Sequence, residues 1–75
     1  MKHYQNLSGK STVAMYELAK DFVTVRFTNQ SVFRYSNQSA GMDNVRQMKT
    51  LALAGKGLGT FIETKLKDLY ARKVR

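Results

Sequence analysis

Two short segments of the chain alternate between apolar and polar residues with a period of two, and four polar residues separate them. Such alternation is typical of strands with one buried and one solvated face, and the short polar link is typical of a hairpin turn. The segments are Val23–Phe27 and Val32–Tyr35, and the link is Thr28-Asn29-Gln30-Ser31. We therefore expect antiparallel strands over residues 22–28 and 32–36.

The alternation also predicts which side chains share a face. Val25, Phe27, Phe33 and Tyr35 fall on the buried face, whereas Arg26 and Arg34 fall on the solvated face. Two arginines opposed on neighbouring strands repel each other, so an anionic ligand is expected near them. The alternative is a solvated basic face whose side chains splay apart.

A further strand is predicted over residues 12–18, and a turn at residues 19–21 joins it to the hairpin. If Val13 and Met15 point inward, Tyr16 points outward, toward the two arginines. Its ring would then stack on a nucleic-acid base whose phosphate the arginines hold. In this register Glu17 lies on the opposite face and cannot neutralise the arginines.

The period changes to that of helices after a polar loop at residues 37–41. Gly55 stands where a glycine commonly ends a first helix, and Thr60-Phe61-Ile62-Glu63 matches the capping box that begins a second. Cations at residues 72–75 suit the C-terminal end of that helix. Glu63 with Lys67 and Asp68 with Arg72 are four residues apart, in the order that favours ion pairs along it. The apolar positions are Met42, Val45, Met48, Leu51 and Ala52 in the first helix, and Phe61, Ile62, Leu66, Leu69 and Tyr70 in the second.

The predicted order is therefore β-β-β-α-α, an α+β fold in which two helices cover one face of a three-stranded antiparallel meander. Residues 1–10 lack periodicity and are expected to form a flexible leader before a single domain over residues 11–75. No apolar run is long enough to span a membrane and no signal peptide is visible, so we expect a cytoplasmic protein without membrane contact. An open sheet edge favours a homo-oligomer, with a monomer as the alternative.

Charge narrows the class of partner. Thirteen lysines and arginines face five acidic residues, which gives a formal net charge of +8 in 75 residues. Such an excess attracts phosphate-bearing partners, which we favour; the alternative is a surface that is merely basic. The chain has no cysteine, so disulfides and thiolate metal sites are excluded.

The sequence does not favour catalysis. Gly9-Lys10-Ser11-Thr12 resembles the end of a phosphate-binding P-loop, but Tyr4 occupies the position of its first glycine and a strand, not a helix, follows. The single histidine, His3, lies in the expected leader, and the acidic residues are spread along the chain. We predict a protein that is not an enzyme and that uses neither a metal nor a cofactor.

The glycine-rich segment Gly55-Lys56-Gly57-Leu58-Gly59-Thr60 is a second candidate anion site. Its backbone can approach a phosphate closely, and free amides at a helix start favour an anion. On this interpretation Lys56, Gly57, Gly59 and Thr60 contact the ligand. The alternative, which we favour, is a tight turn between two helices.

The hairpin and its flanking segments resemble the KTSC domain, a small domain found at the C-terminus of some lysyl-tRNA synthetases and as free-standing short proteins. The resemblance rests on Ser11-Thr12-Val13, Tyr16, the alternating strand at residues 23–27 and Phe33-Arg34-Tyr35, and it covers about residues 11–66. A later segment, Ala54-Gly55-Lys56-Gly57 with Phe61, is also similar. The family has no established activity, but its attachment to a synthetase suggests RNA binding.

These observations favour a non-catalytic module that binds a phosphate-bearing ligand, with RNA first. The predicted ligand-binding residues are Tyr16, Arg26 and Arg34 on the sheet, and Lys56, Gly57, Gly59 and Thr60 in the glycine segment. One alternative is a phage-type protein that sequesters a nucleotide signal at an oligomer interface. Another is an interaction or inhibitor domain that docks an acidic protein.

Overall fold

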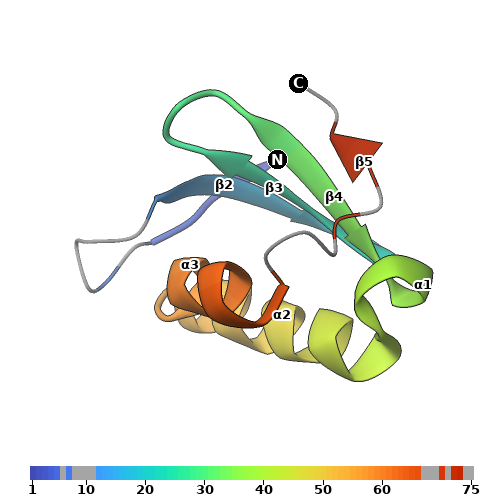
Figure 1. Cartoon of the computed structure of the whole chain (residues 1–75). Helices are drawn as coiled ribbons and strands as arrows, with labels where there is room; N and C mark the ends of the chain where they lie inside the picture. Colours follow the sequence, from blue (N-terminus) through green and yellow to red (C-terminus); the bar gives the residue numbers. More distant parts are fainter. Residues whose placement is uncertain (6, 8–11, 67–69, 71, 74–75) are drawn as a thin grey trace.

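The sheet and the helices of the computed structural model form two layers, with every helix on the same side of the sheet (Figure 1). The structure describes residues 1–5, 7, 12–66, 70 and 72–73. The strands are β1 (Lys2–His3), β2 (Val13–Leu18), β3 (Phe22–Phe27), β4 (Val32–Ser36) and β5 (Arg72–Lys73). The helices are α1 (Asn37–Ala40), α2 (Met42–Ala54), α3 (Leu58–Phe61) and the π-helical η1 (Ile62–Leu66).

The five strands form one antiparallel sheet in sequence order, β1-β2-β3-β4-β5. The predicted α+β class and the central three-strand meander are therefore confirmed. The predicted number of strands is wrong, because β1 and β5 extend the meander at its two edges. Each edge strand is only two residues long, too short to show a period in the sequence.

The predicted hairpin is confirmed, with a tight turn between β3 and β4. The Gln30 amide donates to the Phe27 carbonyl, and the Phe27 amide donates to the Ser31 carbonyl. Gln30 has a φ of 76°, so a residue with a side chain adopts the left-handed conformation. Its Oε1 accepts a hydrogen bond from the Arg26 guanidinium on the preceding strand.

We expect Gln30→Gly to stabilise the fold by about 0.5–1 kcal/mol, because glycine relieves the left-handed strain. Gln30→Ala is the matched control, since it removes the same acceptor but keeps a Cβ at this backbone conformation. Urea unfolding of both variants measures the difference. A glycine variant no more stable than the alanine variant contradicts the prediction.

The core lies between the sheet and the helices. Val25 and Tyr35 are fully covered on the inner face of the sheet, and Phe27 and Phe33 pack against them, as the alternation predicts. The helices contribute the other side, with Met48, Leu58 and Leu66 at zero exposure. The complete buried cluster is Tyr4, Val13, Tyr16, Val23, Val25, Tyr35, Ala40, Val45, Met48, Ala52, Leu58, Ile62 and Leu66.

A β-bulge in β2 overturns the predicted register of that strand. Val13 pairs with Phe27 and Met15 pairs with Arg26, so Ala14 is one extra residue on β2. An inserted residue moves every later side chain to the other face. The prediction that Met15 points inward and Tyr16 outward is therefore wrong.

The expectation of an irregular leader fails for the first residues of the chain. Lys2–His3 pairs with β2 as β1, and the Tyr4 side chain is buried at 5% exposure. The Tyr4 hydroxyl accepts a hydrogen bond from the Leu58 amide at 3.1 Å, and the Leu7 amide donates to the Gly55 carbonyl. The segment is thereby joined to β2 on one side and to the α2–α3 connection on the other.

The first predicted helix is confirmed as α2, which ends at Gly55 in the left-handed conformation. Met42 was assigned to its apolar face, but it is 59% exposed. The polar loop predicted before it is largely the one-turn helix α1. Ser36 begins this helix through a capping box with Ser39, in which each side chain bonds the other residue's backbone amide.

The second predicted helix is wrong at both ends. It begins at Leu58, so Thr60 lies within α3 rather than capping it, and the described helical residues extend to Leu66 in η1. Tyr70 lies outside the helix with its ring 4.7 Å from that of Phe33, and Arg72–Lys73 forms β5. The predicted roles of Lys67, Asp68, Leu69 and Arg75 lie outside the described residues.

Candidate nucleic-acid interface

The face of β2, β3 and β4 that points away from the helices is the first candidate site. Cross-strand partners share a face, so the register defines its members. We call it the open face, and its residues are Met15, Glu17, Phe22, Thr24, Arg26, Val32, Arg34 and Ser36. The prediction that both arginines of the hairpin lie on one face, opposite the core, is confirmed.

Arg34 is packed against an aromatic ring on this face. Its guanidinium carbon lies 4.3 Å from the centre of the Phe22 ring, a cation–π contact. The Arg34 Nε is buried and has no hydrogen-bond partner among the residues that the structure describes. Thr24, the cross-strand partner of Arg34, is 5% exposed, and its Oγ1 is also buried without a partner in the described part of the chain. Two unpaired polar atoms therefore occur on adjacent residues of one face.

Arg26 has a different environment. It pairs across the strands with Val32, and its guanidinium donates to the Gln30 side chain in the turn. The two arginines therefore lie diagonally rather than opposite each other, which weakens the predicted repulsion. The hydrogen bond to Gln30 holds the Arg26 guanidinium toward the hairpin turn.

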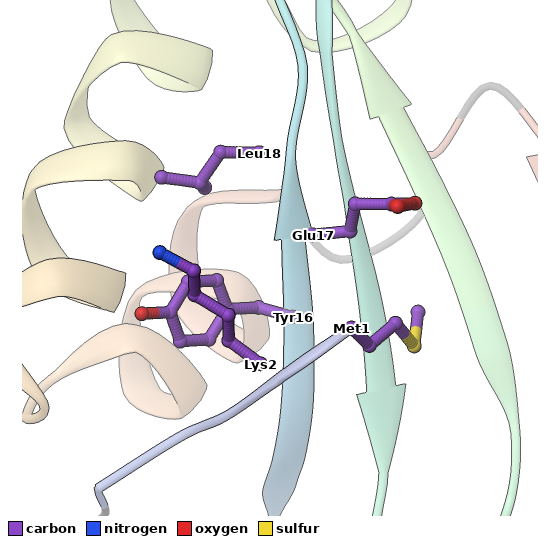
Figure 2. A pocket seen from close by; sticks show the side chains of 5 residues that line it. All are labelled: Met1, Lys2, Tyr16, Glu17 and Leu18. Carbon is purple, nitrogen blue, oxygen red and sulfur yellow. The ribbon is translucent and has the colours of Figure 1, made fainter.

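Tyr16 lies on the other side of the sheet from both arginines. It is 6% exposed, it pairs with Val25, and its ring contacts that of Tyr4 edge-on. Figure 2 shows Tyr16 pointing to the helix side and Glu17 pointing away from it. The predicted stacking position of Tyr16 is therefore wrong, and Glu17 lies on the same face as Arg34, across Thr24.

The residues in Figure 2 line a hollow of about 310 Å³ at the edge of the sheet, where β1 begins beside the end of β2. Met1 and Glu17 point to one side of the sheet, and Lys2, Tyr16 and Leu18 point to the other. One acidic and one basic side chain thus line it from opposite faces. This arrangement does not favour an anionic ligand.

The glycine segment forms the turn between α2 and α3. Gly55 ends α2 and Gly57 precedes α3, both with left-handed backbone. The Leu58 amide, at the start of α3, is occupied by the Tyr4 hydroxyl. Lys56, Gly57 and Thr60 are exposed and Gly59 is buried. These contacts support the turn interpretation, and anion binding by this segment stays a prediction.

Two neighbouring hollows lie at the end of the sheet where β3 begins and β4 ends, and the first of them adjoins the open face. The first, of about 390 Å³, is lined by Asp21, Phe22, Ser36, Asn37 and Gln38. The second, of about 270 Å³, is lined by Lys20, Asp21, Asn37, Met42, Arg46 and Lys49. They share Asp21 and Asn37, and the first reaches Phe22, on which Arg34 packs. The open face thus adjoins the first hollow, and the second hollow, with its three cations, is a neighbour of the first.

Sequence reasoning missed Phe22 and the three cations of the second hollow. The spacing of Arg46 and Lys49 is the signal that could have found two of them, because residues three apart lie on one side of a helix. Lys20 lies in the predicted turn and Phe22 directly follows it, and nothing in the local pattern brings them to α2 or to Arg34.

Metal binding and membrane spanning were also considered for the part of the chain that the structure describes. It contains no group of three or more His, Asp or Glu side chains arranged to hold a metal ion. None of its helices is both long enough and apolar enough to cross a membrane. Three residues of the P-loop-like segment, Gly9 to Ser11, lie outside the described residues.

Comparison with known proteins gives no relative: no family model, no curated protein and no solved structure matches the chain. The resemblance to the KTSC domain therefore rests on the sequence motifs alone. The class that the fold defines is a small α+β domain with an antiparallel sheet covered by helices on one face.

Proposed function

We propose that this protein is a non-catalytic module that binds single-stranded RNA through phosphate contacts on the open face of its sheet. The observation that carries the proposal is the pair formed by Arg34 and Thr24. Both side chains have a buried polar atom without a partner among the described residues, in a chain of net charge +8. An unpaired buried donor costs about 1–3 kcal/mol, and a phosphate oxygen that accepts from it recovers that cost.

The surroundings of Arg34 support the same ligand class. A guanidinium packed on an aromatic ring presents a planar surface on which a base can stack, and its N–H groups match phosphate oxygens. The Nε is covered in the free protein, so binding requires the Arg34 side chain to turn on its flexible stem. Arg26, on the same face, supplies a second cation. Sheets with one face free of helices are used in this way by RNA-binding domains, which is an analogy of architecture.

We expect Arg34→Gln to weaken binding of a labelled single-stranded RNA of about 12 nucleotides by tenfold or more, since a charge-assisted hydrogen bond contributes about 1.5 kcal/mol or more. Fluorescence anisotropy over a range of salt concentrations measures the affinity. Arg34→Lys keeps the charge but loses the planar group, so it should retain the salt dependence and lose most of the affinity.

Lys65→Gln is the matched control, because it removes one positive charge from an exposed side chain of η1, in the helical layer. Its affinity should stay close to that of the unmodified protein. Absence of binding at low salt, or equal effects of Arg34→Gln and Lys65→Gln, would reject the open face as the RNA site.

A further inference from the structure

The second hollow, which we call the α2 hollow, brings together charged side chains from separate parts of the chain. Lys20 and Asp21 come from the turn between β2 and β3, and Arg46 and Lys49 come from α2. Asn37, at the start of α1, and the exposed Met42 complete the lining. Three cations therefore surround this hollow of about 270 Å³ together with one carboxylate, that of Asp21.

Hydrogen bonds hold the lining in place. The Lys49 Nζ donates to the Lys20 carbonyl at 3.1 Å, which joins α2 to the β2–β3 turn. The Asn37 amide donates to the Asp21 carbonyl at 2.9 Å, which joins α1 to the same turn. An ammonium has three N–H donors, so Lys49 keeps two for a ligand while its position is fixed. This preorganisation lowers the entropy lost when a ligand is bound.

The charges around the hollow do not balance. Three positive groups and one negative group leave an excess of two positive charges, which attracts anions to the site. The hollow also shares Asp21 and Asn37 with the neighbouring hollow that contains Phe22. The two hollows are therefore neighbours, and an RNA strand long enough to pass Asp21 and Asn37 can contact both Phe22 and the α2 hollow.

We propose that the α2 hollow is a second phosphate site, in which Lys20, Arg46 and Lys49 hold a backbone phosphate of the same RNA strand. This inference rests on the proposed function and extends it, because it gives the RNA strand a path: from the hairpin, past Phe22, to the side of α2 that adjoins the β2–β3 turn. The negative charge of the Asp21 carboxylate repels the phosphate and lowers the affinity of the site.

The test is the salt dependence of binding to the same labelled RNA. For single strands the slope of log affinity against log salt concentration is about 0.7 per phosphate contact. The double variant Arg46→Gln/Lys49→Gln should therefore lower the slope by about 1.4 and the affinity by about tenfold. The control Lys2→Gln/Lys65→Gln removes two charges from exposed side chains elsewhere and should leave the slope unchanged.

Asp21→Asn is the complementary variant. It removes the carboxylate but keeps the backbone carbonyl that accepts from the Asn37 backbone amide. The affinity for the labelled RNA should therefore rise about threefold, which is about the effect of one charge contact. This gain can be measured even where the double variant fails to fold, which circular dichroism would show. Unchanged or weaker binding by Asp21→Asn contradicts the second site.

RNAs of two lengths distinguish the proposed open-face site from the proposed site in the α2 hollow. A trinucleotide held on the open face alone should respond to Arg34→Gln but not to Arg46→Gln/Lys49→Gln, whereas the longer RNA should respond to both. If the longer RNA responds only to Arg34→Gln, the α2 hollow is not a phosphate site and the open face stands. If the unmodified protein binds neither RNA at low salt, both proposals are wrong.

Discussion

Replacing Tyr4 by alanine is expected to destabilise the protein by about 3–5 kcal/mol, as for other buried aromatic side chains cut back to alanine. Tyr4 is 5% exposed, and its ring packs edge-on against that of Tyr16 in the core. A domain of 75 residues has a total free energy of unfolding of about 4–11 kcal/mol. The change therefore removes a large part of the stability, and urea unfolding would show it as a lower midpoint or as a chain unfolded without denaturant.

Tyr4→Phe separates the ring from its hydroxyl. It keeps the packing but leaves the buried Leu58 amide without its acceptor, which costs about 1–3 kcal/mol. A phenylalanine variant as stable as the unmodified protein would show that this hydrogen bond contributes nothing. An alanine variant within about 1 kcal/mol of the unmodified protein would show that the N-terminal segment is not part of the core.

Gly55→Ala is expected to cost about 2–4 kcal/mol, for two reasons that add together. Gly55 has a φ of 77°, where a side chain is strained. A Cβ at this position would also lie 2.8 Å from the Cβ of Gln5, an atom that can move only with its backbone. The substitution should therefore displace the N-terminal segment from the α2–α3 connection.

Gly57→Ala is the matched control. Its φ of 82° imposes a similar strain, but the nearest atom to its Cβ would be Leu51 Cδ2 at an ordinary 3.5 Å. We expect it to cost about 1–2 kcal/mol, so the difference between the two variants measures the contact with Gln5. Thermal unfolding of both variants tests this. Equal losses would mean that residue 5 does not pack against Gly55.

The hairpin and α2 could be predicted from the sequence because their signals are local. Alternation over five residues places Arg26 and Arg34 on one face, and Gly55 marks the end of a helix that begins at Met42. The bulge at Ala14 could not be predicted, because the residues around an inserted position are as apolar as their neighbours. That one residue reverses the faces of Tyr16 and Glu17, and so changes which side chains can join the arginines.

The rest of the site depends on contacts between distant segments. Phe22 reaches Arg34 only through the pairing of β3 with β4, and Lys20 reaches Lys49 only through the packing of the β2–β3 turn on α2. Tyr4 lies in a segment without periodicity, so its burial has no local signal. Sequence patterns therefore identified the face that carries the arginines but not the residues around them.

The bond between Tyr4 and Leu58 also sets an order for folding. These residues are 54 positions apart, and closing a loop of that length costs about 3.5 kcal/mol of chain entropy before any contact repays it. The β3–β4 hairpin closes a loop of a few residues and can form early, whereas the core around Tyr4 is completed only after Leu58 has been synthesised. We therefore expect the contact between the Tyr4 ring and the α2–α3 connection to form after the β3–β4 hairpin in the folding of the chain.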